Sequence, residues 1–186
     1  MHDLRFAVSD VAGQPGALRH VECEALVEGL AAGGTRVPEG ATIELDLRLE
    51  GVPEGVVVLG QVGGHWEAEC SRCLEPVVGP FSVEAAELFE DEPVESETYL
   101  LDGDEIDLEP LVRDLVVLEL PGAPLCDDDC RGLCPECGAN RNEVTCACVT
   151  DDRDPRWAVL DELRLADAAP PASGADATAD DEKRRS

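Results

Sequence analysis

The feature that most constrains this chain is a run of six cysteines within residues 126–148. At its centre, residues 134–138 read Cys-Pro-Glu-Cys-Gly, a CxxC pair and glycine that place two sulfurs on one tight turn. Residues 146–148 (Cys-Ala-Cys) supply a second close pair, and four thiolates about 2.3 Å from a metal at tetrahedral corners suit zinc. Such a site has no open coordination position, so it stabilises a fold and does not activate water. We predict a structural zinc site formed by Cys134, Cys137, Cys146 and Cys148. A redox-active dithiol and reduced structural cysteines are the alternatives.

Four further cysteines form two looser pairs, one CxxC and one CxxxC. A second four-thiolate site made from both pairs would join distant parts of the chain and replace some of the core that a small domain lacks. The spacing also leaves open a different grouping, in which the first four cysteines of the run at 126–148 surround one metal. The second predicted zinc site consists of Cys70, Cys73, Cys126 and Cys130.

The remaining candidate ligands are the ninth cysteine and one histidine. Cys23 is expected to be a small buried hydrophobe, and His65 a surface or strand histidine. The sequence contains no Ser/His/Asp set, no glycine-rich phosphate loop and no HExxH motif. We therefore predict that the chain is not an enzyme.

The chain is strongly acidic: 42 Asp and Glu against 14 Lys and Arg give a net charge of −28, which bears on the kind of partner it can bind. A surface so negative repels nucleic-acid phosphates, since affinity for them comes from Lys and Arg that displace counterions. A basic protein is the more natural partner, although high net charge also serves solubility alone. Residues 84–109 hold 12 acidic residues and no Lys or Arg, so we expect a solvated loop or a docking surface there.

The N-terminal residues have neither an apolar core segment nor a small-residue cleavage site, so no secretory signal is expected. No stretch approaches the roughly 20 apolar residues of a membrane-spanning helix. We expect a soluble cytoplasmic protein with no membrane partner. In that compartment thiols stay reduced, and cysteines are more often metal ligands than disulfides.

Hydrophobic periodicity predicts the strands. Residues 41–50 alternate four aliphatic side chains with charged ones, the pattern of a half-buried strand. Residues 4–10, 56–62, 65–70 and 81–89 predict further strands, with Gly63–Gly64 as a tight connection. With 44% hydrophobic but only 3% aromatic residues, the core must consist mostly of Val, Leu, Ala and Ile.

Residues 109–120 predict a helix, because Pro110 suits the first turn and an apolar stripe follows. The stripe comprises Leu111, Val112, Leu115 and Leu118, with Val116 beside it. The predicted fold is α+β: an antiparallel sheet of about five or six strands that could close toward a barrel, one main helix and a C-terminal cysteine-rich zinc-binding segment. We divide the chain into a β-rich domain (1–122), a cysteine-rich segment with a short helix at 154–164 (123–166) and a disordered tail (167–186).

Several segments together resemble a known family. Residues 70–76 (CSRCLEP), 130–140 (CRGLCPECGAN), 146–148 (CAC) and 154–157 (DPRW) are similar to the YceD family of bacterial proteins, which has chloroplast relatives. The resemblance covers roughly residues 4–165 and implies that the family's first CxxC pair is Cys70/Cys73.

Members of that family are associated with accumulation of 23S ribosomal RNA. The resemblance therefore implies a non-enzymatic factor in large-subunit biogenesis that supports 23S rRNA accumulation or processing. Its expected partner is a basic ribosomal protein or a large-subunit assembly factor, and direct contact with rRNA stays open. The alternative is a redox-responsive interaction protein, in which thiol oxidation expels zinc and changes partners.

Overall fold

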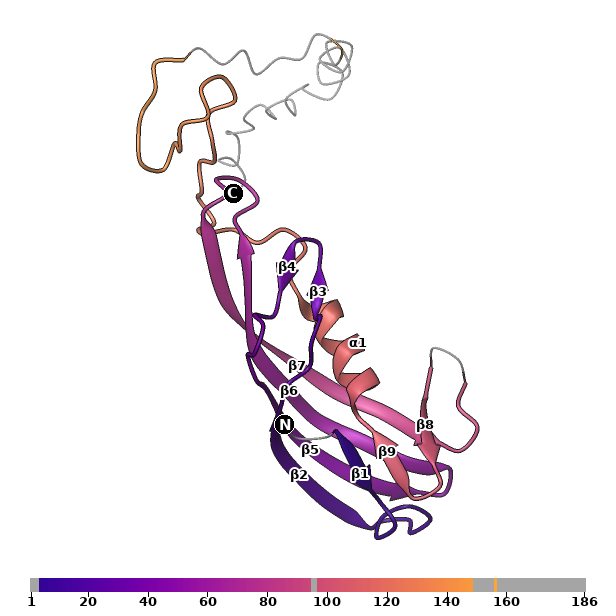
Figure 1. Ribbon diagram of the computed structural model, residues 1–186. Coiled ribbons are helices and arrows are strands. Elements are labelled where there is room, and N and C mark those ends of the chain that lie inside the picture. The colour runs from indigo at the N-terminus through magenta and orange to yellow at the C-terminus, as the bar shows by residue number, and fades with distance from the viewer. Residues whose placement is uncertain (1–3, 95–96, 149–155, 157–186) are drawn as a thin grey trace, which may run out of the picture. The chain divides into compact units, whose positions relative to one another are not determined.

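The computed structural model describes residues 4–94, 97–148 and 156 (Figure 1). The chain divides into two compact units, Met1–Cys146 and Ala147–Ser186, and the elements below belong to the first. The predicted helix at 154–164 and tail at 167–186 lie outside the described residues, apart from Arg156. The described residues form β1 (Arg5–Ala7), β2 (Leu18–Ala25), β3 (Ala31–Ala32), β4 (Thr35–Arg36), β5 (Ile43–Val52), β6 (Gly55–Glu69), β7 (Pro76–Glu90), β8 (Tyr99–Asp102), β9 (Glu105–Asp107) and α1 (Glu109–Glu119).

The sheet is built around the antiparallel strands β5, β6 and β7. The predicted alternation in β5 is confirmed, because Ile43, Leu45, Leu47 and Leu49 are buried while the side chains between them face outward. β6 and β7 pair along their whole length, from Gly55 opposite Glu90 to Glu69 opposite Pro76. This long hairpin carries residues 70–75 at its tip, which is where the first CxxC pair lies.

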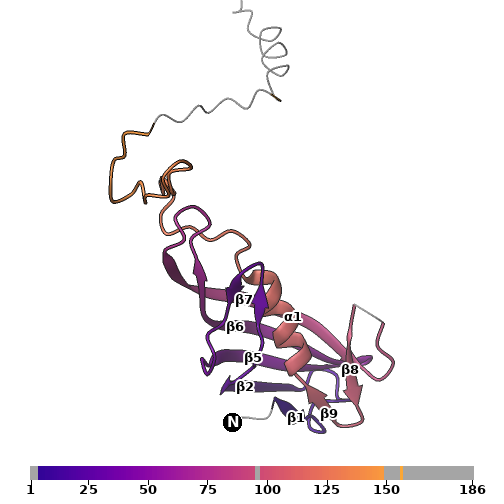
Figure 2. The ribbon, with the colours of Figure 1, turned by 45° about the horizontal axis from the view of Figure 1, so that its top comes forward.

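The predicted α+β fold with five or six antiparallel strands is wrong. The described residues form a mostly β structure, a nine-stranded mixed sheet curved into a half-barrel with one short helix (Figures 1 and 2). The sheet is mixed because β8 runs parallel to β7, with Phe89 opposite Tyr99. Five of the strands have only two to four residues. β1 lies within the strand predicted at residues 4–10, but the other four are too short for a hydrophobic period to reveal them in the sequence.

The predicted break at Gly63–Gly64 is also wrong, because both glycines lie inside the continuous strand β6. Gly64 is opposite Phe81, and a Cβ at Gly64 would lie 2.8 Å from Cζ of that ring. The glycine therefore makes room for a buried aromatic side chain in a strand that continues.

The helix expected at 109–120 is present as α1, which contacts β7, β6 and β3. Leu111, Val112 and Val116 are buried, so the predicted apolar stripe is correct in part. Leu118, which the stripe placed in the core, is 85% exposed. No helix among the described residues is long and apolar enough to span a membrane.

The acidic segment at 84–109 is not one loop. Glu84 and Glu87 lie on β7, and Glu105 lies on β9. The connection between β7 and β8, residues 91–98, is described except for residues 95 and 96. The described carboxylates of residues 84–109 therefore lie on β7, β8 and β9 and at the start of α1 as well as in the connections between these elements.

Candidate metal centre

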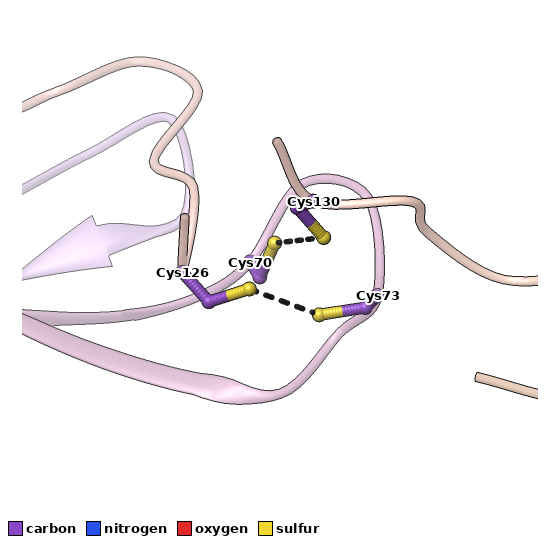
Figure 3. A group of neighbouring side chains, drawn as sticks. All are labelled: Cys70, Cys73, Cys126 and Cys130. Carbon is purple, nitrogen blue, oxygen red and sulfur yellow. Dashed lines mark hydrogen bonds between the residues drawn. The ribbon is translucent and has the colours of Figure 1, made fainter. Parts of the chain in front are cut away.

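Four cysteines from two distant segments meet at the tip of the β6–β7 hairpin (Figure 3). Cys70 and Cys73 lie on the tip itself, and Cys126 and Cys130 come from the segment that follows α1. Cys70, Cys73 and Cys130 are buried, whereas Cys126 is exposed. We call these four residues the hairpin cluster.

The spacing of the hairpin cluster matches tetrahedral coordination. The sulfurs of Cys70 and Cys130 are 3.8 Å apart, those of Cys73 and Cys126 are 3.5 Å apart, and all four lie within 4.8 Å of one another. Four sulfurs about 2.3 Å from one zinc ion would be separated by about 3.8 Å. The cluster can therefore hold a metal ion with little rearrangement.

The turn that carries the first two ligands is a knuckle closed by two backbone hydrogen bonds. The Cys70 N–H donates to the carbonyl of Glu75 (2.8 Å), and the Leu74 N–H donates to the carbonyl of Cys70 (2.9 Å). Leu74 has φ +62°, a left-handed conformation that leucine rarely adopts and that costs roughly 1–2 kcal/mol. The tip is therefore held in a conformation set by the turn and not by the preference of its leucine.

Arg72 fastens the downstream segment to this tip, and Asn142 supports a ligand from within that segment. Arg72 Nη1 donates to the carbonyls of Asp128 (3.1 Å) and Cys130 (3.0 Å), while the Leu133 N–H donates to the carbonyl of Arg72 (3.1 Å). Asn142 Nδ2 donates to the sulfur of Cys130 (3.2 Å). Metal ligands are commonly oriented by outer hydrogen bonds of this kind.

The electrostatics of the hairpin cluster favour thiolates at some positions. Burial raises the pKa of Cys70, but backbone N–H donors outweigh burial and bring that pKa down to about 6. The Asn142 amide lowers the pKa of Cys130, and the hydrogen bond with Cys130 raises the pKa of Cys126 to about 12. A cluster that holds some thiolates beside protonated thiols would release the remaining protons on binding a divalent cation.

The second group consists of Cys134, Cys137, Cys146 and Cys148, whose sulfurs also lie within 4.8 Å of one another. We call it the knuckle cluster. Its first turn repeats the geometry of the hairpin tip, with Cys134 N–H donating to Ala139 (2.8 Å) and Gly138 N–H donating to Cys134 (2.8 Å). Gly138, at φ +71°, occupies the place that Leu74 has in the hairpin tip.

The two clusters differ in exposure. In the knuckle cluster only Cys134 is buried, Cys146 is half-buried, and Cys137 and Cys148 are exposed. The backbone N–H groups of Cys137 and Glu136 lower the pKa of Cys134 to about 6. The knuckle cluster therefore has the same donor set as the hairpin cluster but much less protection from solvent.

The structure brings together both predicted sets of four cysteines, and the alternative grouping around one metal does not form. Cys23 is half-buried in β2, and neither it nor His65 belongs to a cluster. Sequence reasoning missed the structural roles of Arg72 and Asn142. Arg72 sits inside the CxxC pair, which was a visible signal, whereas nothing in the sequence pairs Asn142 with Cys130.

The family described as large ribosomal RNA subunit accumulation protein YceD matches residues 58–164. The chain belongs to this family. The YceD-family match extends from β6 through β7 and α1 and includes every cysteine of both clusters. The resemblance found in the sequence is thereby confirmed.

Three relatives show how far the YceD-family likeness extends. An uncharacterized protein of Mycobacterium bovis is 42% identical over 138 residues, covering 68% of this chain and 64% of the relative. An uncharacterized protein of Mycobacterium leprae is 37% identical over 185 residues, covering 92% of this chain and 82% of the relative. Large ribosomal RNA subunit accumulation protein YCED homolog 1, chloroplastic, of Arabidopsis thaliana is 28% identical over 151 residues, covering 63% and 44%. The chain thus spans less than two-thirds of the M. bovis protein and under half of the plant protein, and no solved structure matches it.

Proposed function

We propose that this YceD-family chain is a non-enzymatic cytoplasmic factor that supports accumulation of 23S rRNA during large-subunit biogenesis. The family match over residues 58–164 carries the proposal, because the family's description links its members to the large ribosomal RNA. The plant relative with the same description supports it.

A protein partner fits the charge of the chain better than direct contact with rRNA. Its 42 acidic and 14 basic residues give a net charge of −28, which opposes binding to phosphates. Ribosomal RNA is bound by basic proteins. The negative charge of an acidic factor is complementary to the positive charge of such a protein, so the factor could bind the protein until the RNA does. We infer that the partner is a basic ribosomal protein or a large-subunit assembly factor.

Zinc is the metal that best suits both cysteine clusters, because four sulfur donors in tetrahedral spacing favour it. In this proposal zinc in the hairpin cluster fastens residues 126–130 to the β6–β7 tip, and zinc in the knuckle cluster stabilises the turn at 134–138. Neither ion would have an open coordination position, so their contribution would be to the fold.

Depletion of the protein tests the function. We expect the ratio of 23S to 16S rRNA, and the large-subunit peak in a sucrose gradient, to fall by a factor of about two or more and to recover when the wild-type chain is supplied. A ratio that stays unchanged after complete depletion would contradict the proposal. The 16S level is the internal control, because a general loss of transcription or growth would lower both RNAs.

A redox-responsive role is the second candidate, and the exposure of Cys137 and Cys148 favours it. Exposed thiolate ligands are open to oxidation. The knuckle cluster has two exposed cysteines, whereas the hairpin cluster has one, Cys126, beside three that are buried. If the chain is such a switch, mild peroxide should release about one zinc ion per chain, from the knuckle cluster, as followed with a chromogenic zinc chelator. Full retention of zinc under peroxide would contradict the redox role and leave only the structural one.

A further inference from the structure

α1 carries one strongly exposed apolar side chain and, next to it, two partly buried ones that also pack against the core. Leu118 is 85% exposed, the largest value among the exposed large hydrophobic residues described. Leu115 and Val117 are only partly buried beside it. A helix that packs one face on a sheet normally has polar residues on the opposite face, so this apolar surface calls for an explanation.

These side chains line a groove of about 750 Å³ next to α1. Besides the three apolar residues of the helix, its described lining includes Tyr99 and Thr98 from the β8 region. The Tyr99 hydroxyl donates to Asp114 Oδ2 (3.0 Å), which fixes the ring against the helix. The groove thus has apolar lining residues, one of them held by a hydrogen bond, and is large enough to take up apolar side chains from another molecule.

The polar part of the lining is mostly negative. Glu87, Glu97 and Asp114 contribute three carboxylates, and Arg113 is the one basic residue among the described residues that line the groove. Its guanidinium is already engaged, because Nη2 bonds Glu109 Oε1 (3.0 Å) and Nη1 bonds the carbonyl of Glu28 (3.1 Å). A ligand in the groove would therefore meet both apolar surface and negative charge.

We propose that this groove, which we call the α1 groove, binds a basic amphipathic segment of a protein partner. Apolar side chains of that segment would cover Leu118 and Leu115, and its Lys or Arg side chains would pair with Glu87 and Glu97. The inference deepens the proposed function, on which it rests for the partner's role in large-subunit biogenesis. It assigns the contact to one surface and gives the chemistry of the segment that fits it.

Charge decides between this occupant and two others. A second copy of the chain would bring a further net charge of −28 to an acidic surface, so self-association there is opposed by repulsion. An RNA strand would bring phosphates to the same carboxylates. A segment with both basic and apolar side chains is complementary to the carboxylates and to the apolar residues that line the groove.

Photo-cross-linking in cells identifies the occupant. A benzoylphenylalanine in place of Leu118, in the full chain, should cross-link to a protein, and the cross-linked peptide should contain Lys or Arg between apolar residues. Leu18, 61% exposed on β2, is the control position and should not give the same product. A cross-link to RNA or to a second copy of the chain, or none at all, would overturn the inference.

The affinity of the identified segment then tests the two kinds of contact. In fluorescence anisotropy with a labelled synthetic copy of that peptide, Leu118→Ser should weaken Kd about tenfold or more, whereas Leu18→Ser should leave it unchanged. The double variant Glu87→Gln, Glu97→Gln should weaken Kd and flatten its dependence on salt. Equal affinity for the wild-type chain and Leu118→Ser would refute the assignment to the α1 groove.

Failure of this inference is distinguishable from failure of the proposed function. If depletion lowers 23S rRNA and Leu118→Ser restores it fully, the α1 groove is not the contact and the function stands. If depletion leaves 23S rRNA unchanged while the peptide binds as described, the groove stands and the ribosomal role does not.

Discussion

Replacing Cys130 with serine is expected to remove about one zinc ion per chain and to destabilise the first unit by several kcal/mol. Cys130 is buried, with its sulfur 3.8 Å from that of Cys70 and hydrogen-bonded to Asn142. A structural zinc site supplies on the order of 10 kcal/mol of apparent binding free energy at neutral pH. A loss of even about 3 kcal/mol would lower Tm by about 6–12 °C in a chain of this length.

The measurements are zinc content by mass spectrometry and thermal unfolding by circular dichroism. Cys23→Ser is the matched control, since Cys23 is a half-buried cysteine of β2 that belongs to neither cluster. It should keep the wild-type zinc content and a Tm within a few degrees. Zinc content that is the same in the Cys130 variant and the wild type would show that the hairpin cluster binds none.

Hydrogen exchange locates the damage. In the wild type the Ser71 N–H donates to the carbonyl of Pro124 (2.8 Å) and the Leu133 N–H donates to the carbonyl of Arg72 (3.1 Å). Both bonds join the hairpin tip to the segment after α1, so their amides should exchange faster in Cys130→Ser. Amides of β5, which pair with β2 and β6, should keep their protection unless the whole unit unfolds.

The cysteine clusters could be predicted because each ligand pair is local in the sequence. Cys70 and Cys73 are brought together by a single turn, and so are Cys134 and Cys137. Only the question of which pairs share a metal site depends on the fold. The structure made that choice, since β6 and β7 carry Cys70 to the end of a long hairpin where Cys130 arrives after α1. Sequence spacing alone could not exclude the other grouping.

The sheet was less predictable for physical reasons. β5 was recognisable because its alternation of buried and exposed residues spans the whole strand, and α1 because Pro110 marks its start. Strands such as β3, with two residues, have no period to detect. Gly64 was misread as a turn residue because its role, making room for the ring of Phe81, depends on a strand pairing that the sequence does not reveal.

The second large effect is expected from Phe89→Ala, which should destabilise the first unit by about 3–5 kcal/mol. Phe89 is 1% exposed, lies opposite Val56 on β6 and Tyr99 on β8, and stacks on the Tyr99 ring at 5.1 Å between centroids. Removing the ring leaves a cavity where three strands meet and removes an aromatic pair worth about 0.5–1.5 kcal/mol. Urea unfolding followed by circular dichroism measures the change.

Leu100→Ala is the matched control for Phe89→Ala, because Leu100 lies on β8 beside Tyr99 but is 54% exposed. Truncation of an exposed side chain should change stability by no more than about 0.5 kcal/mol. If Phe89→Ala folds too poorly to study, Phe89→Leu is the substitute, because it keeps much of the apolar volume. Its free energy of unfolding should lie between those of Phe89→Ala and Leu100→Ala. Equal stability of the wild type and both Phe89 variants would contradict the packing described for β7 and β8.

Zinc content separates the effect of Phe89→Ala from that of Cys130→Ser. Phe89 is near the end of β7, and Pro76 at its start adjoins the hairpin tip, a separation of about 43 Å along the strand at about 3.3 Å per residue. If zinc occupies the hairpin cluster, as proposed, a cavity at that distance should lower the free energy of unfolding while the folded chain keeps the metal, because the ring is far from the four cysteines. Loss of zinc from folded Phe89→Ala would mean that the two ends of the hairpin are coupled, and that the metal responds to the packing of the half-barrel as well as to its own ligands.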